Sequence, residues 1–157
     1  MTEKKAPKPG KNRRKSRELV LKGLYSLLLT ESDLQKTMDD LADDEAYKRA
    51  DAAYFKSLLA GVMLERATLE AHISPLLDRK LSELSPIEHG ILCIAAYELL
   101  HDPSIPYRVA INEGVELAKL YGGTDGYKYV NGVLDKLAAL ARPNEISDLR
   151  PARNAKI

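Results

Sequence analysis

Apolar residues recur along this 157-residue chain at intervals of three and four, and alternation with a period of two is not sustained anywhere. This spacing puts apolar side chains on one face of an α-helix, whereas a half-buried strand alternates. The pattern therefore predicts an all-α protein of about seven helices. The expected elements are helices over residues 16–30, 50–73, 76–83, 87–100, 107–121 and 125–141, with a short helix or loop in the acidic stretch 33–45.

The clearest helix start in the sequence is Ser85-Pro86-Ile87-Glu88. It combines an N-cap serine, a proline at the first helical position and a glutamate three residues after the cap, which is the pattern of a capping box. The helix that follows is apolar nearly all round, with Glu88, His89 and Glu98 as its polar interruptions. We expect it to lie at the centre of a helical core.

The last expected helix contains Asn131-Gly132 near its middle. Both residues are poor helix formers, and the glycine costs about 1 kcal/mol relative to alanine. Close approach of another backbone or of a ligand would explain the glycine, and a helix crossing would explain it equally well.

Length and cysteine content favour a protein of the reducing cytoplasm. A chain of this size suits one domain with a real core. The lone Cys93 excludes an internal disulfide, and the first thirty residues contain no pattern of a signal peptide. No apolar run reaches the roughly eighteen residues that a membrane-spanning helix needs.

The net charge of +1 conceals a strong asymmetry. Residues 1–22 carry nine Lys/Arg against two acidic residues, whereas residues 23–157 carry fifteen against twenty-one. We expect a basic, disordered head at residues 1–15, one helical domain at 16–141 and a flexible tail at 142–157. The basic residues of the head and the first helical turn are Lys4, Lys5, Lys8, Lys11, Arg13, Arg14, Lys15 and Arg17.

Clustered Lys and Arg side chains gain most when they replace counterions on phosphates, so the head indicates a polyanionic partner. A solubilising tail is the alternative. Arg13 and Arg17 continue the stripe that Val20 and Leu24 form on the first helix. Because unpaired charges cannot occupy a dry core, we expect both arginines to be presented outward.

Tyr129 is a candidate stacking residue on the last helix. Asp125, Gly132 and Lys136 share its flank of the helix, so an aromatic ring lies beside a glycine and a lysine. Stacking of an unpaired base on an aromatic ring is worth about 1 to 3 kcal/mol. The alternative is a tyrosine at the edge of the core.

Catalysis finds little support in the sequence. His89 and Cys93 lie four apart and share a helix face, which is the spacing of half a metal site or of a base beside a thiol nucleophile. No Cys-x-x-Cys pair or glycine-rich phosphate loop is present, and His72 and His101 fall on other segments. We therefore expect no enzymatic activity, no metal and no cofactor, with His89 and Cys93 as core side chains.

Five strings of the sequence resemble the NusB transcription antitermination family. They are Asp51-Ala-Ala-Tyr54-Phe55, Leu58-Leu59-Ala60-Gly61-Val62, Ile91-Leu92-Cys93-Ile94-Ala95-Ala96-Tyr97-Glu98-Leu99, Ile105-Pro106-Tyr107-Arg108-Val109-Ala110-Ile111-Asn112-Glu113 and Tyr129-Val130-Asn131-Gly132-Val133-Leu134-Asp135-Lys136. With Arg13-Arg14-Lys15-Ser16-Arg17 as the arginine-rich head, the resemblance covers residues 12–141. It implies a bacterial, cytoplasmic protein with two packed helical subdomains and no catalytic activity.

The resemblance also implies function. It implies binding of the boxA element of nascent transcripts, notably those of ribosomal RNA, together with NusE, the small ribosomal subunit protein that doubles as a transcription factor. The transcribing RNA polymerase complex would be an indirect partner. The residues implied in RNA binding are Arg13, Arg14, Lys15, Arg17, Lys128, Tyr129 and Asn131. Those implied in NusE binding are Tyr25, Glu88 and Leu92.

Two residues depart from the family pattern. Cys93 stands where the family often has arginine, and Lys15 replaces an arginine of the head. A lysine still meets a phosphate as a point charge but lacks the bidentate fork. Glu88 also has a purely local interpretation as the third residue of the capping box.

Alternative interpretations stay open at this point. One is a helical protein-binding scaffold without RNA contact. Another is an RNA-binding accessory domain, since NusB-like domains also occur in RNA methyltransferases. Apolar helix faces that bind partners can also bind copies of themselves, so both a monomer and a homodimer remain compatible with the sequence.

Overall fold

The computed structural model describes residues 9–149, and side chains from Asn12 to Asp148. Over this range the chain forms eight α-helices and three short 3-10 helices with no strand, which confirms the all-α prediction. The chain divides into two units, residues 1–64 and 65–157, which are described separately below. The predictions for residues 1–8 and 150–157 lie outside the described residues.

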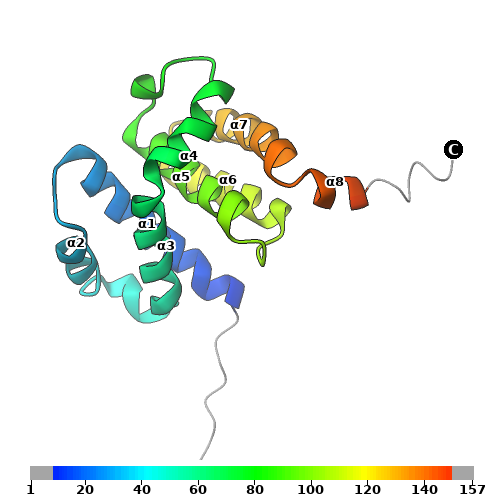
Figure 1. The fold of residues 1–157 in the computed structure, drawn as a ribbon. Helices are drawn as coiled ribbons and strands as arrows, with labels where there is room; N and C mark the ends of the chain where they lie inside the picture. Colours follow the sequence, from blue (N-terminus) through cyan, green and yellow to red (C-terminus); the bar gives the residue numbers. More distant parts are fainter. Residues whose placement is uncertain (1–8, 150–157) are drawn as a thin grey trace, which may run out of the picture. The chain divides into compact units, whose positions relative to one another are not determined.

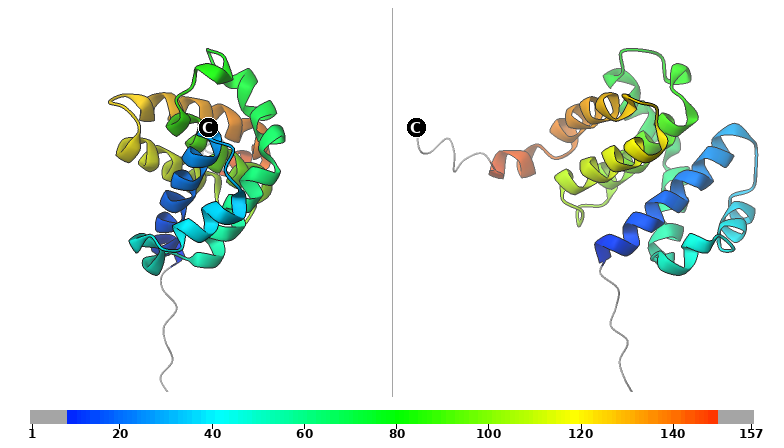
Figure 2. Two further views of the ribbon diagram at one scale, coloured as in Figure 1. Left: turned by 90° about the vertical axis from the view of Figure 1, so that its left-hand side faces the viewer. Right: turned by 180° about the vertical axis from the view of Figure 1, so that it is seen from behind.

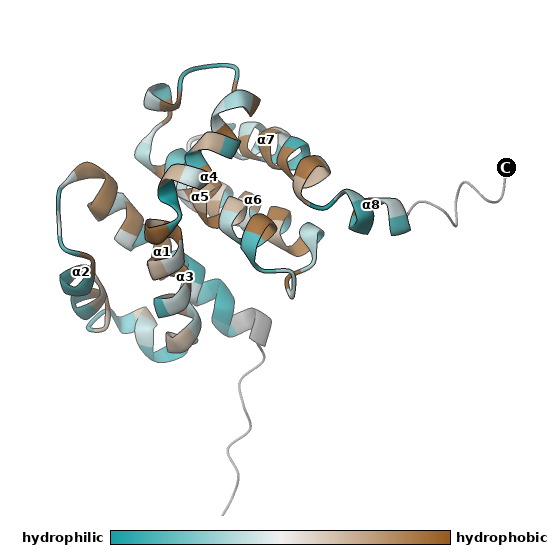
Figure 3. Cartoon of the chain, viewed as in Figure 1, coloured by the Kyte–Doolittle hydropathy of each residue, from teal (hydrophilic) through white to brown (hydrophobic). Residues whose placement is uncertain are grey.

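The first unit is built on two long helices that contact each other, α1 and α3 (Figure 1). Apolar stripes on both helices are buried, with Val20 and Leu24 on α1 and Phe55 and Leu59 on α3. Figure 3 shows α1 changing from polar near its start to apolar toward its end. The elements are α1 (Pro9–Leu29), α2 (Leu34–Leu41), the 3-10 helix η1 (Glu45–Arg49) and α3 (Ala52–Leu64).

Helix α1 begins at Pro9, seven residues before the expected start, so residues 9–15 are not the disordered head that the sequence predicted. Ser16, the expected first residue, lies inside the helix. Its hydroxyl donates to the carbonyl oxygens of Asn12 (3.1 Å) and Asp51 (2.7 Å), and it accepts from the Asp51 N–H at 3.0 Å. These bonds fix the start of α1 to the segment that leads into α3.

The expected helix over 50–73 is two helices, because the backbone at Glu65 leaves helical geometry (φ −96°, ψ 11°). No glycine or proline marks this break, which explains why the apolar spacing concealed it. The helix expected over 76–83 is also absent. Two 3-10 turns flank an irregular segment there, Ser74–Leu76 and Leu81–Glu83.

The second unit surrounds the apolar helix α5, as its sequence predicted. Helices α4, α6 and α7 all contact α5, and every residue from Gly90 to Ala96 is buried (Figures 1 and 2). The capping box is confirmed: the Ser85 Oγ accepts from the Glu88 N–H at 3.1 Å, and Glu88 accepts from the Ser85 N–H at 3.3 Å. The elements are α4 (Arg66–Ile73), η2 (Ser74–Leu76), η3 (Leu81–Glu83), α5 (Pro86–His101), α6 (Tyr107–Tyr121), α7 (Gly126–Ala141) and α8 (Pro143–Leu149).

Helices α6 and α7 lie side by side and are joined by the turn at residues 122–125 (Figure 2). Gly122 ends α6 with extended dihedral angles (φ −85°, ψ 171°). A Cβ atom at this position would lie 2.8 Å from the carbonyl oxygen of Ala118. The glycine is therefore explained by close packing on the last helical turn.

Arg142 connects three carbonyl groups at the end of α5. Its Nε donates to the Leu99 oxygen at 2.8 Å, and its Nη2 donates to the oxygens of Glu98 and Asp102 at 3.0 Å each. The Glu98 and Asp102 oxygens also accept backbone N–H groups, from Asp102 at 3.2 Å and Ile105 at 3.1 Å, so the guanidinium adds a second, charged donor to both. The last carbonyls of a helix lack a full set of partners within the helix, and this guanidinium supplies donors to them. The sequence marked Arg142 only as the end of the ordered body.

Residues 143–149 form α8, so the flexible tail expected from residue 142 does not begin there. Glu145 on this helix has two partners outside it. Its carboxylate pairs with Arg142 and also accepts from the Tyr107 N–H at the start of α6, at 2.9 Å. The Tyr107 N–H, together with the Arg142 guanidinium, keeps the pKa of Glu145 below its usual value.

None of the helices between residues 9 and 149 is long and apolar enough to cross a membrane.

We expect Arg142→Ala to lower the free energy of unfolding by about 2 to 4 kcal/mol, because charged hydrogen bonds to three carbonyls are lost. The free energy of unfolding of Arg142→Lys should lie between those of the parent chain and Arg142→Ala, since an ammonium group keeps the charge but cannot reach three acceptors as a planar fork. Urea denaturation followed by circular dichroism measures both. Equal stability of the alanine variant and the parent chain would contradict this role of Arg142.

Candidate nucleic-acid interface

The arginines at the start of α1 are seated on an aromatic ring of α3. The guanidinium carbon of Arg13 lies 4.2 Å from the centre of the Tyr54 ring, and that of Arg17 lies 5.5 Å from it. Arg17 is only 3% exposed and Arg13 is half-buried. The prediction that both are presented outward is therefore wrong, because the ring offers a face on which weakly hydrated guanidinium groups can pack.

Burial of Arg13 leaves one of its donors unsatisfied. Its Nε is shielded from solvent and has no hydrogen-bond partner among the residues that the structure describes. The contact that holds this guanidinium is the Tyr54 ring face. Arg13 and Arg17 thus contribute positive charge beneath the surface and also contribute to packing.

Arg14 and Lys15 are the members of the predicted RNA-binding head that reach the surface. Arg14 is exposed, and the Lys15 side chain is 38% exposed with its Nζ 3.6 Å from Glu18. Such an exposed ion pair is weak and can exchange for a phosphate contact. Among the described side chains at this end of α1, these two residues therefore carry most of the accessible positive charge.

A second basic and aromatic cluster lies in the other unit, near the start of α7. The Arg79 guanidinium carbon lies 4.2 Å from the centre of the Tyr129 ring, and its Nε donates to Asp78 at 2.8 Å. Lys128 and Asn131 are exposed on the same helix as Tyr129. The Lys128 Nζ lies 3.6 Å from Asp125, again an exposed ion pair.

Tyr129 is a half-buried residue whose hydroxyl makes no hydrogen bond of normal geometry with any described residue. Burial raises the pKa of Tyr129, and the neighbouring Asp78 carboxylate acts in the same direction through its charge. The phenol is therefore neutral at physiological pH. One face of its ring is covered by the Arg79 guanidinium.

Arg79 is a site residue that the sequence analysis missed. It lies in the irregular segment between the two 3-10 turns, where the sequence led us to expect a helix. The available signal was the short polar run Asp78-Arg79-Lys80 directly after a proline-containing turn.

Gly132 has open space around it. A Cβ atom built there meets no other described atom within 4 Å, and the residue is exposed. Of the explanations left open by the sequence, a helix crossing within the described chain is therefore removed. Approach of an external ligand is still compatible with the position.

The residues implied in partner binding differ in accessibility. Tyr25 on α1 is 44% exposed and can be contacted directly. Glu88 is half-buried, and one carboxylate oxygen serves the capping box. Leu92 is fully buried, so its side chain is not accessible in this structure, and its implied part in partner binding stays a prediction.

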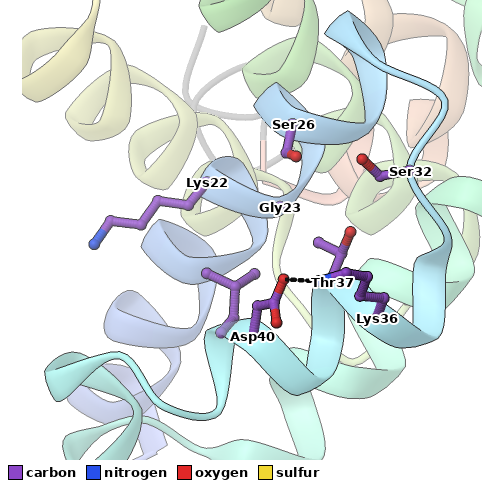
Figure 4. A pocket seen from close by; sticks show the side chains of 8 residues that line it. Lys22, Gly23, Ser26, Ser32, Lys36, Thr37 and Asp40 are labelled. Carbon is purple, nitrogen blue, oxygen red and sulfur yellow. Dashed lines mark hydrogen bonds and ion pairs between the residues drawn. The ribbon is translucent and has the colours of Figure 1, made fainter.

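A small pocket between α1 and α2 has little binding capacity (Figure 4). Its volume is about 180 Å³, and its lining includes Lys22 and Lys36. Both ammonium groups already have acidic partners, Asp44 at 2.9 Å for Lys22 and Asp40 at 3.1 Å for Lys36. The pocket is therefore a small polar gap between α1 and α2 in which both lysines are already paired with carboxylates.

Comparison with known proteins identifies the family. The NusB family model matches residues 14–139. The transcription antitermination protein NusB of Methylobacillus flagellatus is 66% identical over 142 residues, which cover 90% of this chain and 92% of that protein. The protein of the same name from Thiobacillus denitrificans is 56% identical, covering 86% and 93%. The chain belongs to the NusB family.

Solved structures agree with this assignment. NusB of T. maritima is 29% identical and superposes with a TM-score of 0.77, covering 92% of this chain and 99% of that one. A chain from a crystal structure described as antitermination factors NusB and NusE in complex with dsRNA gives a TM-score of 0.71 at 23% identity, covering 82% and 97%. The second similarity shows a shared NusB fold.

The NusB family match includes both basic clusters. It begins at Arg14 and so includes Arg14 and Lys15, and it also spans Arg79, Tyr129 and Asn131. Each cluster combines exposed cations with an arginine seated on a tyrosine ring.

The ring of Tyr54 can be tested by substitution. Tyr54→Leu should lower the free energy of unfolding by about 1 to 2 kcal/mol, because two cation–π contacts are lost while apolar bulk is kept. Tyr54→Phe retains both ring faces and serves as the matched control. Denaturation midpoints measure the difference, and equal losses in the two variants would show that the ring face has no special role.

Proposed function

We propose that this chain is a transcription antitermination factor that binds boxA-type single-stranded RNA in nascent transcripts, notably those of ribosomal RNA, together with NusE. It would act in the cytoplasm and reach the transcribing RNA polymerase indirectly. Membership of the NusB family supports this proposal. The observation that carries it is the pair at the start of α7, where the Arg79 guanidinium lies over the Tyr129 ring, with Lys128 and Asn131 exposed on the same helix.

The two basic clusters suit different parts of a nucleic acid. Arg14 and Lys15 are exposed cations on a helix without an aromatic face of their own, so they suit phosphates. Arg79 and Tyr129 present stacked planar groups, which suit an unpaired base. Because phosphate contacts position a ligand and base contacts specify it, sequence selectivity would reside near Tyr129.

Single-stranded RNA is preferred on chemical grounds. In an A-form duplex the bases are stacked inside and the major groove is too narrow for side chains, so a stacking pair has nothing to engage. The related complex of NusB and NusE that contains dsRNA makes the duplex the necessary comparison ligand. NusE docking would use Tyr25, which is exposed, with Glu88 contributing its charge beside its capping role.

Salt dependence tests RNA binding by the whole chain. If Arg14, Lys15 and Lys128 each displace one phosphate counterion, affinity should fall about 18-fold between 50 and 200 mM salt, using a slope of about 0.7 per contact. Arg14→Ala with Lys15→Ala should reduce that fall to about threefold. Fluorescence anisotropy with boxA RNA, a scrambled strand and the matching duplex, with and without NusE, provides the measurement.

The matched control for this test is Lys36→Ala with Lys56→Ala, which removes the same charge from exposed positions of α2 and α3. The control should keep the parent salt slope. If both double variants change the slope equally, attraction is due to overall charge and the α1 site is wrong. If the parent chain shows no RNA binding at low salt, a protein scaffold is the better description.

Gly132→Ala tests whether RNA approaches the backbone of α7. Removing a mid-helix glycine from an open position should stabilise the chain by about 0.5 to 1 kcal/mol. If RNA approaches the open space at Gly132, the same substitution should weaken boxA binding severalfold. Ala139→Gly, at an exposed position of the same helix, should destabilise the chain without weakening RNA binding. Unaltered RNA affinity in Gly132→Ala would exclude close approach at this point.

A further inference from the structure

Three potential metal ligands of different chemical types meet between α4 and α5 in the second unit. The side-chain ligand atoms of Glu70, His89 and Cys93 all lie within 4.8 Å of one another. The sequence showed only the half-set on α5, His89 and Cys93, because Glu70 lies on the preceding helix. The fold therefore supplies the third ligand that the spacing lacked.

The donor set selects a class of cation. A thiolate, an imidazole and a carboxylate together suit Zn²⁺ and similar borderline ions, whereas Mg²⁺ and Ca²⁺ prefer oxygen ligands alone. Three protein ligands would leave the fourth tetrahedral position for water. We propose that Glu70, His89 and Cys93 form a site for one zinc-class divalent cation that links α4 to α5.

The geometry requires small side-chain movements. The His89 Nε2 lies 2.7 Å from the Glu70 Oε2, which is a hydrogen bond. Ligand atoms around a tetrahedral zinc lie about 3.3 to 3.8 Å apart, as bond lengths of about 2.0 Å to nitrogen or oxygen and 2.3 Å to sulfur require. The His–Glu pair must open by about 0.6 Å, and the Cys93 Sγ, which lies within 4.8 Å of both other ligand atoms, must come to about 3.5 Å from them. His89 and Cys93 are one helical turn apart, so neither helix needs to shift.

Charge around the cluster is compatible with a cation. Arg66 donates to Glu70 at 2.8 Å, and both this bond and the His89 bond end on Oε2. Arg66 opposes the cation electrostatically, but it can stay as the outer hydrogen-bond partner that ligating carboxylates commonly have. The Cys93 thiol would lose its proton to solvent as its sulfur binds the ion, so binding adds a net single positive charge.

Access to the cluster is one-sided. The side chains of His89 and Glu70 are 15% and 21% exposed, whereas Cys93 is only 2% exposed. An ion can therefore arrive from solvent through the imidazole and carboxylate while the sulfur forms the buried end. The site shares two turns of α5 with Glu88 and Leu92 but does not depend on the proposed RNA function.

Cobalt(II) provides a direct test on the full chain, prepared reduced and metal-free. Binding should saturate at one equivalent and give a thiolate-to-cobalt charge-transfer band, together with the intense visible bands of a tetrahedral site. Zinc should displace cobalt stoichiometrically, and competition with a chromophoric chelator should give the zinc affinity. Zinc should also raise the thermal midpoint, because the site exists only in the folded chain.

Variants separate the proposed ligands from adventitious binding. Cys93→Ser should abolish the charge-transfer band. His89→Gln and Glu70→Gln should each weaken zinc binding by more than about 100-fold, because loss of a ligand exceeds the roughly 10- to 100-fold effect of changing an outer-shell partner. His72→Gln is the matched control, since His72 is exposed on α4 and bonds the Thr68 carbonyl. It should leave zinc binding unchanged.

Three results would overturn the site. They are absence of the charge-transfer band in the folded parent chain, persistence of the band in Cys93→Ser, and equal zinc affinity in the His89 and His72 variants. Circular dichroism on each variant identifies any that fails to fold, and His89→Gln carries the test if Cys93→Ser is unfolded. RNA affinity of the parent chain is measured separately, so failure here is distinct from failure of the RNA proposal.

Discussion

A guanidinium group lying over a tyrosine ring is the interaction on which both basic sites depend. In the first unit the ring is Tyr54, and in the second it is Tyr129. Arginine is weakly hydrated and planar, so it can pack on an aromatic face at little desolvation cost while its charge is kept. This allows a protein to hold positive charge in a fixed place before any polyanion arrives, and a preorganised site loses less conformational entropy on binding.

The two rings are used differently. Tyr54 receives arginines from a neighbouring helix and is part of the fixed packing of its unit, together with the hydrogen bonds between Ser16 and Asp51. Tyr129 receives one arginine from an irregular, exposed segment. An arginine on a segment without helical hydrogen bonds can leave its ring more easily than one on a helix, so the second site is better suited to exchange a guanidinium for a base.

The sequence was most informative where local signals and apolar spacing agreed. The capping box at Ser85 and the apolar helix α5 were predicted correctly because both depend on residues close together in the chain. The errors have long-range causes. Arg17 is buried by a ring 37 positions further along the chain, and Arg142 caps a helix that ends some 40 residues before it. Neither partner could be chosen from spacing alone, and the break at Glu65 has no marker residue.

The arginine-rich run shows how helical geometry divides one charge cluster into two functions. Positions 13 and 17 are one turn apart and share a face, so a single ring on α3 can take both. Positions 14 and 15 are rotated away from that face and carry the exposed charge. Counting every basic residue of the run as a phosphate contact therefore overstates its electrostatic affinity. In a disordered head all four basic residues would be equivalent, whereas in the helix the two arginines held on the Tyr54 ring fix the direction in which Arg14 and Lys15 point.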